Sequence, residues 1–233
     1  MPEFDVNTPS IARVYDYWLG GTDNFAADRE LGDMMLALYP PTADIVRENK
    51  QFLTHAVTWV AEQGIGQFID LGAGLPTSPS TLETARAVIP YARVACVDND
   101  PVVLNHLRAL VGKGIDLEAP ACLMMGSLLH FFPVDVGHDM LERYVAALAP
   151  GSYVILSVGR GVGELSERFI STYRDGGPPL YYYSAADVTG LLSSLEVVPP
   201  GIAEARAWRP GWAEPPSVAP RAGDIVAFVA RQR

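Results

Sequence analysis

The sequence predicts an α/β protein with a doubly wound, mostly parallel sheet that follows an N-terminal helical cap. From residue 64 onward, short apolar runs alternate with segments of helical periodicity, the pattern of strands joined by crossover helices. A glycine-rich turn closes the first of these runs. The first 63 residues show helical spacing alone. We therefore expect a helical cap over 1–63 and a sheet domain over 64–233, folded as one compact unit.

The composition is that of a packed protein that does not bind nucleic acid. Apolar residues make up 49% and charged residues 19% of the 233 positions, which excludes wholesale disorder. The 17 basic and 27 acidic side chains leave a net charge of −10, which repels a phosphate backbone. No polybasic or long apolar segment predicts a membrane contact. Cys96 and Cys122 stand singly in apolar runs, as in a reduced cytoplasmic protein, so we expect no disulfide and no metal site. We expect a monomer or a homodimer.

The cap should consist of three helices: Ile11–Leu19, Phe25–Leu38 and Asp44–Gln63. Gly20 and Gly21 close the first, and Asp23 or Asn24 is the expected N-cap of the second. Gly64 supplies the C-terminal cap of the third.

The sheet domain should alternate strands and helices to its last residues. The expected strands are Gln67–Leu71, Tyr91–Val97, Ala121–Gly126, Ser152–Ser157 and Asp224–Arg233. The expected helices are Ser80–Ile89, Pro101–Val111, Met140–Leu148, Glu164–Tyr173 and Ser184–Leu192, of which the first and last begin with capping-box spacing. The proline-rich segment 199–220 should wrap the surface. In such sheets a ligand lies beyond the carboxyl ends of the strands, where the strand order reverses.

The strongest candidate site is the run Asp70–Gly74 after the first strand, together with Asp98 at the end of the second. Gly72 and Gly74 allow a tight turn and a close approach of the backbone to a ligand. Asp98 can accept hydrogen bonds from both hydroxyls of a ribose. A plain strand-to-helix turn is the alternative for the glycines alone; with the acid in register, the pattern favours a nucleoside.

The same loop indicates which class of nucleoside cofactor the site would bind. A dinucleotide fingerprint needs a third glycine so that the helix N-terminus meets the pyrophosphate. Here Thr77 holds that position, Pro76 interrupts, and the helix starts only near Ser80. NAD fits this loop poorly. S-adenosylmethionine fits it, because Asp70 can face the ammonium group of that cofactor.

Several segments resemble one family, the actinobacterial S-adenosylmethionine-dependent methyltransferases formerly classed as a domain of unknown function. They are Ala12–Arg29, Phe68–Thr77, Val97–Leu104, Leu128–Phe131, Gly151–Ser157 and Trp208–Pro210. The resemblance implies a class I methyltransferase fold, which is Rossmann-like, and S-adenosylmethionine as cofactor. It implies no acceptor.

The resemblance also assigns candidate cofactor contacts. Gly72, Gly74, Asp98 and the adjoining Asn99 fall in its cofactor motifs. Four residues of the N-terminal signature would fold over the site as part of the cap: Tyr17, Gly20, Gly21 and Asn24. Helix packing and an ordinary helix C-cap are the alternative interpretation of these four.

His130 is the candidate catalytic residue. It follows the strand Ala121–Gly126, on the segment that meets the acceptor in class I methyltransferases. A neutral imidazole there could take a proton from the acceptor as the methyl group arrives. A structural histidine bonded to a backbone carbonyl is the alternative. For His138 with its acidic neighbours, a polar loop explains the cluster better than a metal site.

Three further features bear on function. Arg160, in a glycine-rich loop, could pair with an anionic acceptor, and the run Tyr181–Tyr183 is most simply a strand, although one ring could line the acceptor pocket. Between Asp98 and Ala121 the chain is too short for the complete fold, so the third-strand region beside the adenine should be shortened.

The sequence therefore predicts methyl transfer from S-adenosylmethionine to a small-molecule acceptor. The alternative is a methyltransferase fold repurposed as a cyclase-like enzyme or as a non-catalytic ligand-binding protein.

Overall fold

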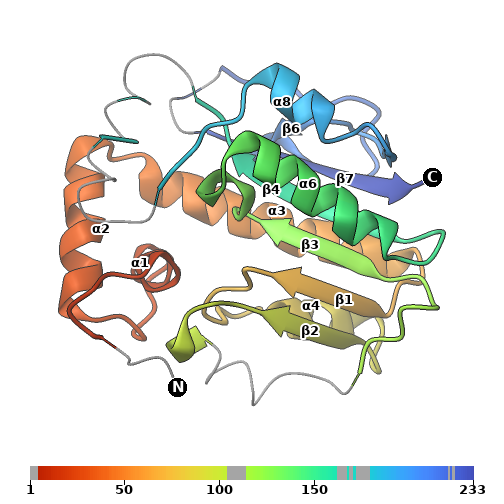
Figure 1. Ribbon diagram of the computed structural model, residues 1–233, viewed down its shortest axis with the longest axis horizontal. Helices are drawn as coiled ribbons and strands as arrows, with labels where there is room; N and C mark the ends of the chain where they lie inside the picture. The colour runs from red at the N-terminus through yellow and green to blue at the C-terminus, as the bar shows by residue number, and fades with distance from the viewer. Residues whose placement is uncertain are drawn as a thin grey trace.

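Seven strands form one sheet, in the order β2-β1-β3-β4-β7-β5 with β6 paired to β7. The computed structural model describes residues 5–103, 114–161, 167, 170–171, 179–219, 221 and 224–233. The strands are β1 Gln67–Leu71, β2 Arg93–Val97, β3 Cys122–Gly126, β4 Tyr153–Gly159, β5 Leu195–Val197, β6 Ala203–Glu204 and β7 Ile225–Gln232. Helices cover both faces of the sheet (Figure 1), which confirms the predicted α/β class.

β7 is the strand that runs against the others. β1 pairs in parallel with β2 and β3, and β3 pairs in parallel with β4. β7 is antiparallel to β4, β5 and β6, so the sheet is mostly parallel, as predicted. The chain passes from β1 to β2 on one side and then to β3 on the other side of β1. The strand order therefore reverses at the carboxyl ends of β1 and β3, where a ligand is expected.

Alternating strand side chains divide the apolar interior into two layers. Met124 of β3 packs in the layer that contains α3 Thr42–Glu62 and α4 Thr81–Val88. Leu123, the preceding residue, packs in the opposite layer with α6 Val134–Ala146 and α8 Ala185–Gly190. Both side chains are fully buried, as the two-residue period of a strand covered on both faces requires.

The cap lies across the carboxyl ends of the parallel strands (Figure 1). Its helices α1 Ile11–Trp18 and α2 Ala26–Leu38 share a separate apolar cluster, in which Val14 and Met35 are fully buried. Val46, at the start of α3, joins that cluster, whereas the rest of α3 packs against the sheet. α3 therefore connects the cap to the sheet.

A buried ion-pair network attaches the cap. The Arg13 guanidinium on α1 lies 3.0 Å from Asp28 on α2 and 3.6 Å from Asp100, which follows β2. Asp28 also accepts the backbone N–H groups of Ser10 and Phe25, both at 2.8 Å. The expected N-cap of α2 was therefore wrong: Phe25 holds that position, and Asp28, inside the first turn, accepts its backbone N–H.

Other elements differ locally from the sequence prediction. α6 begins at Val134, ahead of the expected Met140, so His138 lies on a helix and not in a polar loop. The residues Tyr181–Tyr183 form no strand. The proline-rich segment does not only wrap the surface, because it contains β6, the 3-10 turn η2 Ala205–Ala207 and the fully buried Trp208, whose ring lies 5.2 Å from that of Phe52.

The region between β2 and β3 is short, as predicted. Its described residues, 98–103 and 114–121, form no strand. Most of the helix expected over 101–111 and most of that expected over 164–173 lie outside the described residues. Within the described part of the chain, no helix has the length and apolarity that a membrane crossing requires.

Candidate cofactor and acceptor site

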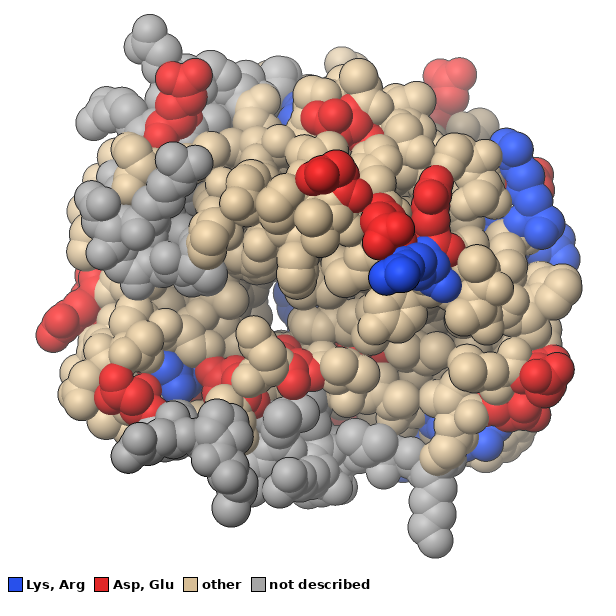
Figure 2. Space-filling view, in the orientation of Figure 1, with Lys and Arg blue, Asp and Glu red and all other residues tan. Residues whose placement is uncertain are grey.

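A cavity of about 440 Å³ lies between the cap and the carboxyl ends of β1, β2 and β3. The loop after β1, the residues after β2 and β3, and one side of α1 and α3 line it. Figure 2 shows a hollow near the middle of this face, with acidic side chains beside it. The cavity therefore occupies the place where the strand order reverses.

The glycine loop forms one wall of this cavity. Gly72 and Gly74 both adopt left-handed backbone conformations, with φ of +67° and +64°. A Cβ atom on Gly72 would lie 2.7 Å from the Leu128 side chain, whereas a Cβ atom on Gly74 would meet nothing within 4 Å. Gly72 therefore allows close packing inside the protein, and Gly74 leaves open space for a ligand to approach the backbone.

Asp98 is held by the backbone around it. One carboxylate oxygen accepts the Gly74 N–H at 2.9 Å, and the other accepts the Asp100 N–H at 3.0 Å. A carboxylate offers about four lone-pair positions, so each oxygen can accept one further hydrogen bond. Asn99, exposed beside it, also lines the cavity. These groups fit the two hydroxyls of a ribose.

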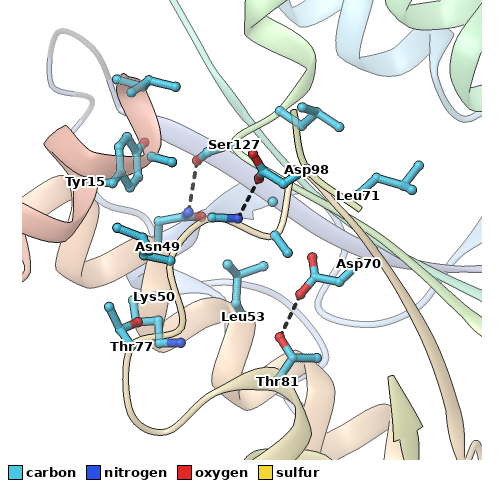
Figure 3. A pocket seen from close by; sticks show the side chains of 18 of the residues that line it. Tyr15, Asn49, Lys50, Leu53, Asp70, Leu71, Thr77, Thr81, Asp98 and Ser127 are labelled. Atoms are coloured by element: carbon cyan, nitrogen blue, oxygen red, sulfur yellow. Dashed lines mark hydrogen bonds between the residues drawn. The ribbon is translucent and has the colours of Figure 1, made fainter. Parts of the chain in front are cut away.

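Asp70 is the buried acid of the site. The Thr81 hydroxyl donates to its Oδ2 at 2.8 Å (Figure 3), and Asp70 and Lys50 both line the cavity. Burial raises the pKa of Asp70 to about 6; the Thr81 hydrogen bond and the Lys50 charge oppose this shift, and the nearby Asp98 adds to it. A cationic group beside Asp70 would stabilise its ionised form. An ammonium group is therefore a suitable ligand for this part of the cavity.

Asn49, Ser127 and Tyr15 form a polar group on the opposite wall that sequence reasoning missed. Asn49 Nδ2 donates to Ser127 Oγ at 2.9 Å, and Ser127 holds a left-handed φ of +52° (Figure 3). Burial raises the pKa of Tyr15, and a hydrogen bond with Ser127 opposes the shift. Asn49 Oδ1 is buried and has no hydrogen-bond partner among the described residues. A signal for Asn49 existed: it is a polar residue at helical spacing between the apolar Ile45 and Phe52.

A polar ligand could donate a hydrogen bond to the buried Asn49 Oδ1 and occupy the open space beside Gly74. Asp70, Gly72, Gly74, Asp98 and Asn99, all predicted from the sequence, meet at this cavity. Their donor and acceptor groups fit S-adenosylmethionine, which carries both a ribose and an ammonium group.

The four cap residues of the predicted site do not line this cavity. Tyr17 donates its hydroxyl to Asp33 at 2.7 Å on the surface of the cap. Asn24 donates to the Asp16 carboxylate at 2.8 Å, and a Cβ atom on Gly21 would overlap that same carboxylate. Gly20, with φ of +81°, closes α1. The structure thus places Tyr17 on α1 and the other three residues in the turn between α1 and α2.

His130 lines a second, smaller cavity and not the large one. It lies in the 3-10 turn η1 Leu129–Phe131, where its side chain is 5% exposed. The Gly159 N–H donates to His130 Nδ1 at 3.0 Å. Burial lowers the pKa of His130 to about 4, so the ring is neutral at physiological pH. This arrangement favours a hydrogen-bonding imidazole over a general base.

The remaining polar candidates already have protein partners. Arg160 forms a 2.7 Å ion pair with Glu204. His138 Nε2 lies 3.0 Å from the backbone oxygen of Asp187. Within the described ranges, no three His, Cys, Asp or Glu side chains gather in a way that could hold a metal ion.

Comparisons with known proteins identify the family of the chain. The chain matches the S-adenosyl methyltransferase family over residues 1–114 and 111–233. A proposed methyltransferase from Thermobifida fusca is 34% identical and superimposes with a TM-score of 0.90, covering 100% of this chain and 98% of that one. A DUF574 family protein from Streptomyces avermitilis is 30% identical, with a TM-score of 0.90 and coverage of 99% and 100%.

A more distant O-methyltransferase family protein from Burkholderia thailandensis, 13% identical, shares the fold with a TM-score of 0.53 over 91% of this chain and 73% of that one. No curated protein matches significantly. The family predicted from the N-terminal and glycine-loop motifs is confirmed, and with it the cofactor, S-adenosylmethionine. The chain belongs to the S-adenosyl methyltransferase family.

Proposed function

We propose that the protein transfers the methyl group of S-adenosylmethionine to a small-molecule acceptor. The observation that carries this proposal is the cavity of about 440 Å³ at the reversal of strand order. Gly74, Asp98 and Asp70 converge on it in a chain of the S-adenosyl methyltransferase family. When bound, the cofactor supplies an activated methyl group on a sulfonium.

The expected cofactor contacts follow from the hydrogen-bonding capacity of Asp98 and Asp70 and from the space beside Gly74. Asp98 is fixed by two backbone amides and would accept the ribose hydroxyls. Gly74 leaves room for the ligand to lie against the backbone. Asp70 would hold the ammonium group, with Oδ2 kept in place by Thr81. Because these groups are already positioned, binding costs little reorganisation of the protein.

The same cavity also offers an apolar wall away from the carboxylates. Leu128, Phe132, Met140 and Tyr144 line it on the side of α6. Methyl transfer from a sulfonium depends mainly on alignment of the acceptor atom with the methyl carbon and the sulfur. The cap, which contributes Ile11 and Tyr15 to the lining, would exclude water from that alignment. His130, which lines the smaller cavity together with Tyr15, is the candidate for contact with the acceptor.

Calorimetry with S-adenosylmethionine tests the donor half of this proposal. We expect micromolar binding by the wild-type protein and a loss of about tenfold to a hundredfold in Asp98→Ala, the effect of removing one buried hydrogen-bonding partner. Asp44→Ala, an exposed carboxylate on α3 outside the cavity, is the matched control and should bind as the wild type does. Absence of binding at millimolar cofactor would overturn the proposal.

The transfer step needs a separate measurement, since a binding protein would pass the first. The protein and methyl-labelled cofactor are incubated with a collection of small molecules, and methylated products are sought by mass spectrometry. A methylated product that disappears with Asp98→Ala supports the enzyme. Tight cofactor binding with no methylated product across neutral, cationic and anionic acceptors would instead support the non-methylating alternative.

A further inference from the structure

A second cavity of about 70 Å³ adjoins the large one under the cap. Tyr15 and Phe131 belong to the linings of both cavities, so these two rings stand at the boundary between them. One water molecule needs roughly 10–15 Å³ by a comparable measure, so the space suits a group of roughly five to seven heavy atoms. The second cavity therefore has the size of a ring, placed beside the expected cofactor site.

The described lining of the second cavity carries no charged side chain. Among the described residues around it there is no Asp, Glu, Lys or Arg. Aromatic rings from separate segments surround the space: Tyr15 and Trp18 of α1, Phe131 of η1, and Tyr182 just before α8. Aromatic rings pack against other rings in offset or edge-to-face arrangements, and an ionised group would lose its solvation here. The lining therefore favours an uncharged ring.

His130 supplies one directional polar group to this lining. The Gly159 N–H occupies the Nδ1 lone pair at 3.0 Å, so the neutral ring carries its proton on Nε2. Among the described residues, none forms a hydrogen bond with Nε2. The side chain is more than nine-tenths buried. Because His130 lines the second cavity, a ligand oxygen held there would give the Nε2–H donor an acceptor.

We propose that the second cavity holds an uncharged aromatic or alicyclic ring of the methyl acceptor, with a hydroxyl or carbonyl oxygen of that ring bonded to His130 Nε2–H. This inference rests on the proposed function and names the substrate class of its acceptor. The methyl-accepting atom then lies past Tyr15 and Phe131, toward the large cavity. His130 acts as a donor that orients the acceptor, and the same geometry leaves no free imidazole lone pair for proton abstraction.

Binding of small rings to the full chain in the presence of S-adenosylhomocysteine tests the proposal. The probes are phenol, toluene and benzoate: one ring with a hydroxyl, with no oxygen, and with a charge. Ligand-observed NMR and titration should give phenol a Kd of about 1 mM or tighter, toluene weaker binding and benzoate none. A long-range ¹H–¹⁵N spectrum should show His130 protonated at Nε2, with the Nε2 resonance shifting as phenol is added.

Two variants separate the contribution of the His130 hydrogen bond from that of the second cavity's volume. His130→Asn keeps an oxygen near the position of Nδ1 for the Gly159 N–H but removes the Nε2–H donor. This variant should weaken the binding of phenol about tenfold and leave the binding of toluene unchanged. Leu180→Trp, at a buried residue that lines the second cavity alone, should fill it and abolish binding of both rings. His55→Asn, on α3 outside both cavities, is the control and should bind the probes as the wild type does.

The outcomes also distinguish this inference from the proposed function. If S-adenosylmethionine binds but Leu180→Trp, with unchanged cofactor affinity, still binds phenol as the wild type does, the second cavity is not the ring site. Absence of phenol binding to the wild-type protein, preference for benzoate, or protonation at Nδ1 would likewise overturn the inference. A protein that binds no S-adenosylmethionine would instead refute the proposed function.

Discussion

Gly74 donates its backbone N–H to the Asp98 carboxylate across 2.9 Å, and this bond joins the loop after β1 to the end of β2. The second Asp98 oxygen accepts the Asp100 N–H, two residues along the chain. Asp100 in turn lies 3.6 Å from Arg13 of the cap. The carboxylate expected to hold the ribose is therefore connected both to the glycine loop and to the helix that covers the cavity. Changes in either part should affect cofactor binding.

The two glycines of the loop should respond differently to alanine. Both adopt positive φ, so Gly72→Ala and Gly74→Ala should each lower the free energy of unfolding by about 1–2 kcal/mol from backbone strain. Only Gly72→Ala also forces the Leu128 side chain to move. Adding Leu128→Ala should therefore recover part of the loss in Gly72→Ala but combine additively with Gly74→Ala, as measured by urea unfolding. Equal coupling of Leu128 to both glycines would contradict this interpretation.

Arg13 should be the most costly charged residue of the cap to replace. Its side chain is 4% exposed and lies between the buried carboxylates of Asp28 and Asp100. Arg13→Met leaves both acids without this partner, so we expect a loss of about 3–5 kcal/mol in the free energy of unfolding and weaker cofactor binding.

An exposed ion pair provides the control for Arg13. Arg47 pairs with Asp44 on α3, but both side chains are more than half exposed. Arg47→Met should change the free energy of unfolding by less than about 0.5 kcal/mol in the same denaturant series. A loss of the same size in both variants would show that the burial of Arg13 is unimportant.

Local signals in the sequence predicted much of the fold. Ser80 and Glu83 stand at capping-box spacing, and both hydrogen bonds of the box form at the start of α4. Asp98 could be placed near Gly74 because the carboxyl ends of neighbouring parallel strands meet at one edge of the sheet. Signals within one turn or between adjacent strands are sufficient for such predictions.

Contacts between distant segments could not be predicted in this way. Asn49 and Ser127 are 78 positions apart, and nothing in either local sequence indicates their hydrogen bond. The burial of Trp208 against Phe52 depends on how the proline-rich segment returns to α3. The side chain of His130 turns toward Gly159 and the second cavity, although its position after β3 was predicted correctly. Those parts of the site depend on tertiary packing.

Asp70 should make the protein less stable as the pH rises. Burial raises its pKa from 3.8 to about 6, so the folded state holds this proton more tightly than the unfolded state does. Stability from this group is therefore present below pH 3.8 and is lost as the pH rises to about 6. Asp70→Asn should be more stable than the wild type at pH 7 by about 1–3 kcal/mol and much closer to it at pH 4. Urea unfolding at both pH values checks this; a variant less stable at pH 7 would contradict it.

His130 should have the opposite effect over an overlapping range. Burial lowers its pKa from 6.5 to about 4, so the unfolded state binds the proton more readily. Stability from His130 is present above pH 6.5 and is lost as the pH falls toward 4. Because the Asp70 contribution falls with rising pH while that of His130 increases, the wild-type protein should show a shallow pH dependence between 4 and 6.5 from this pair. Asp70→Asn should expose the His130 contribution as an increase of about 1–3 kcal/mol from pH 4.5 to 7. Adding His130→Asn should remove that increase; an increase that persists in the double variant would assign it to other groups.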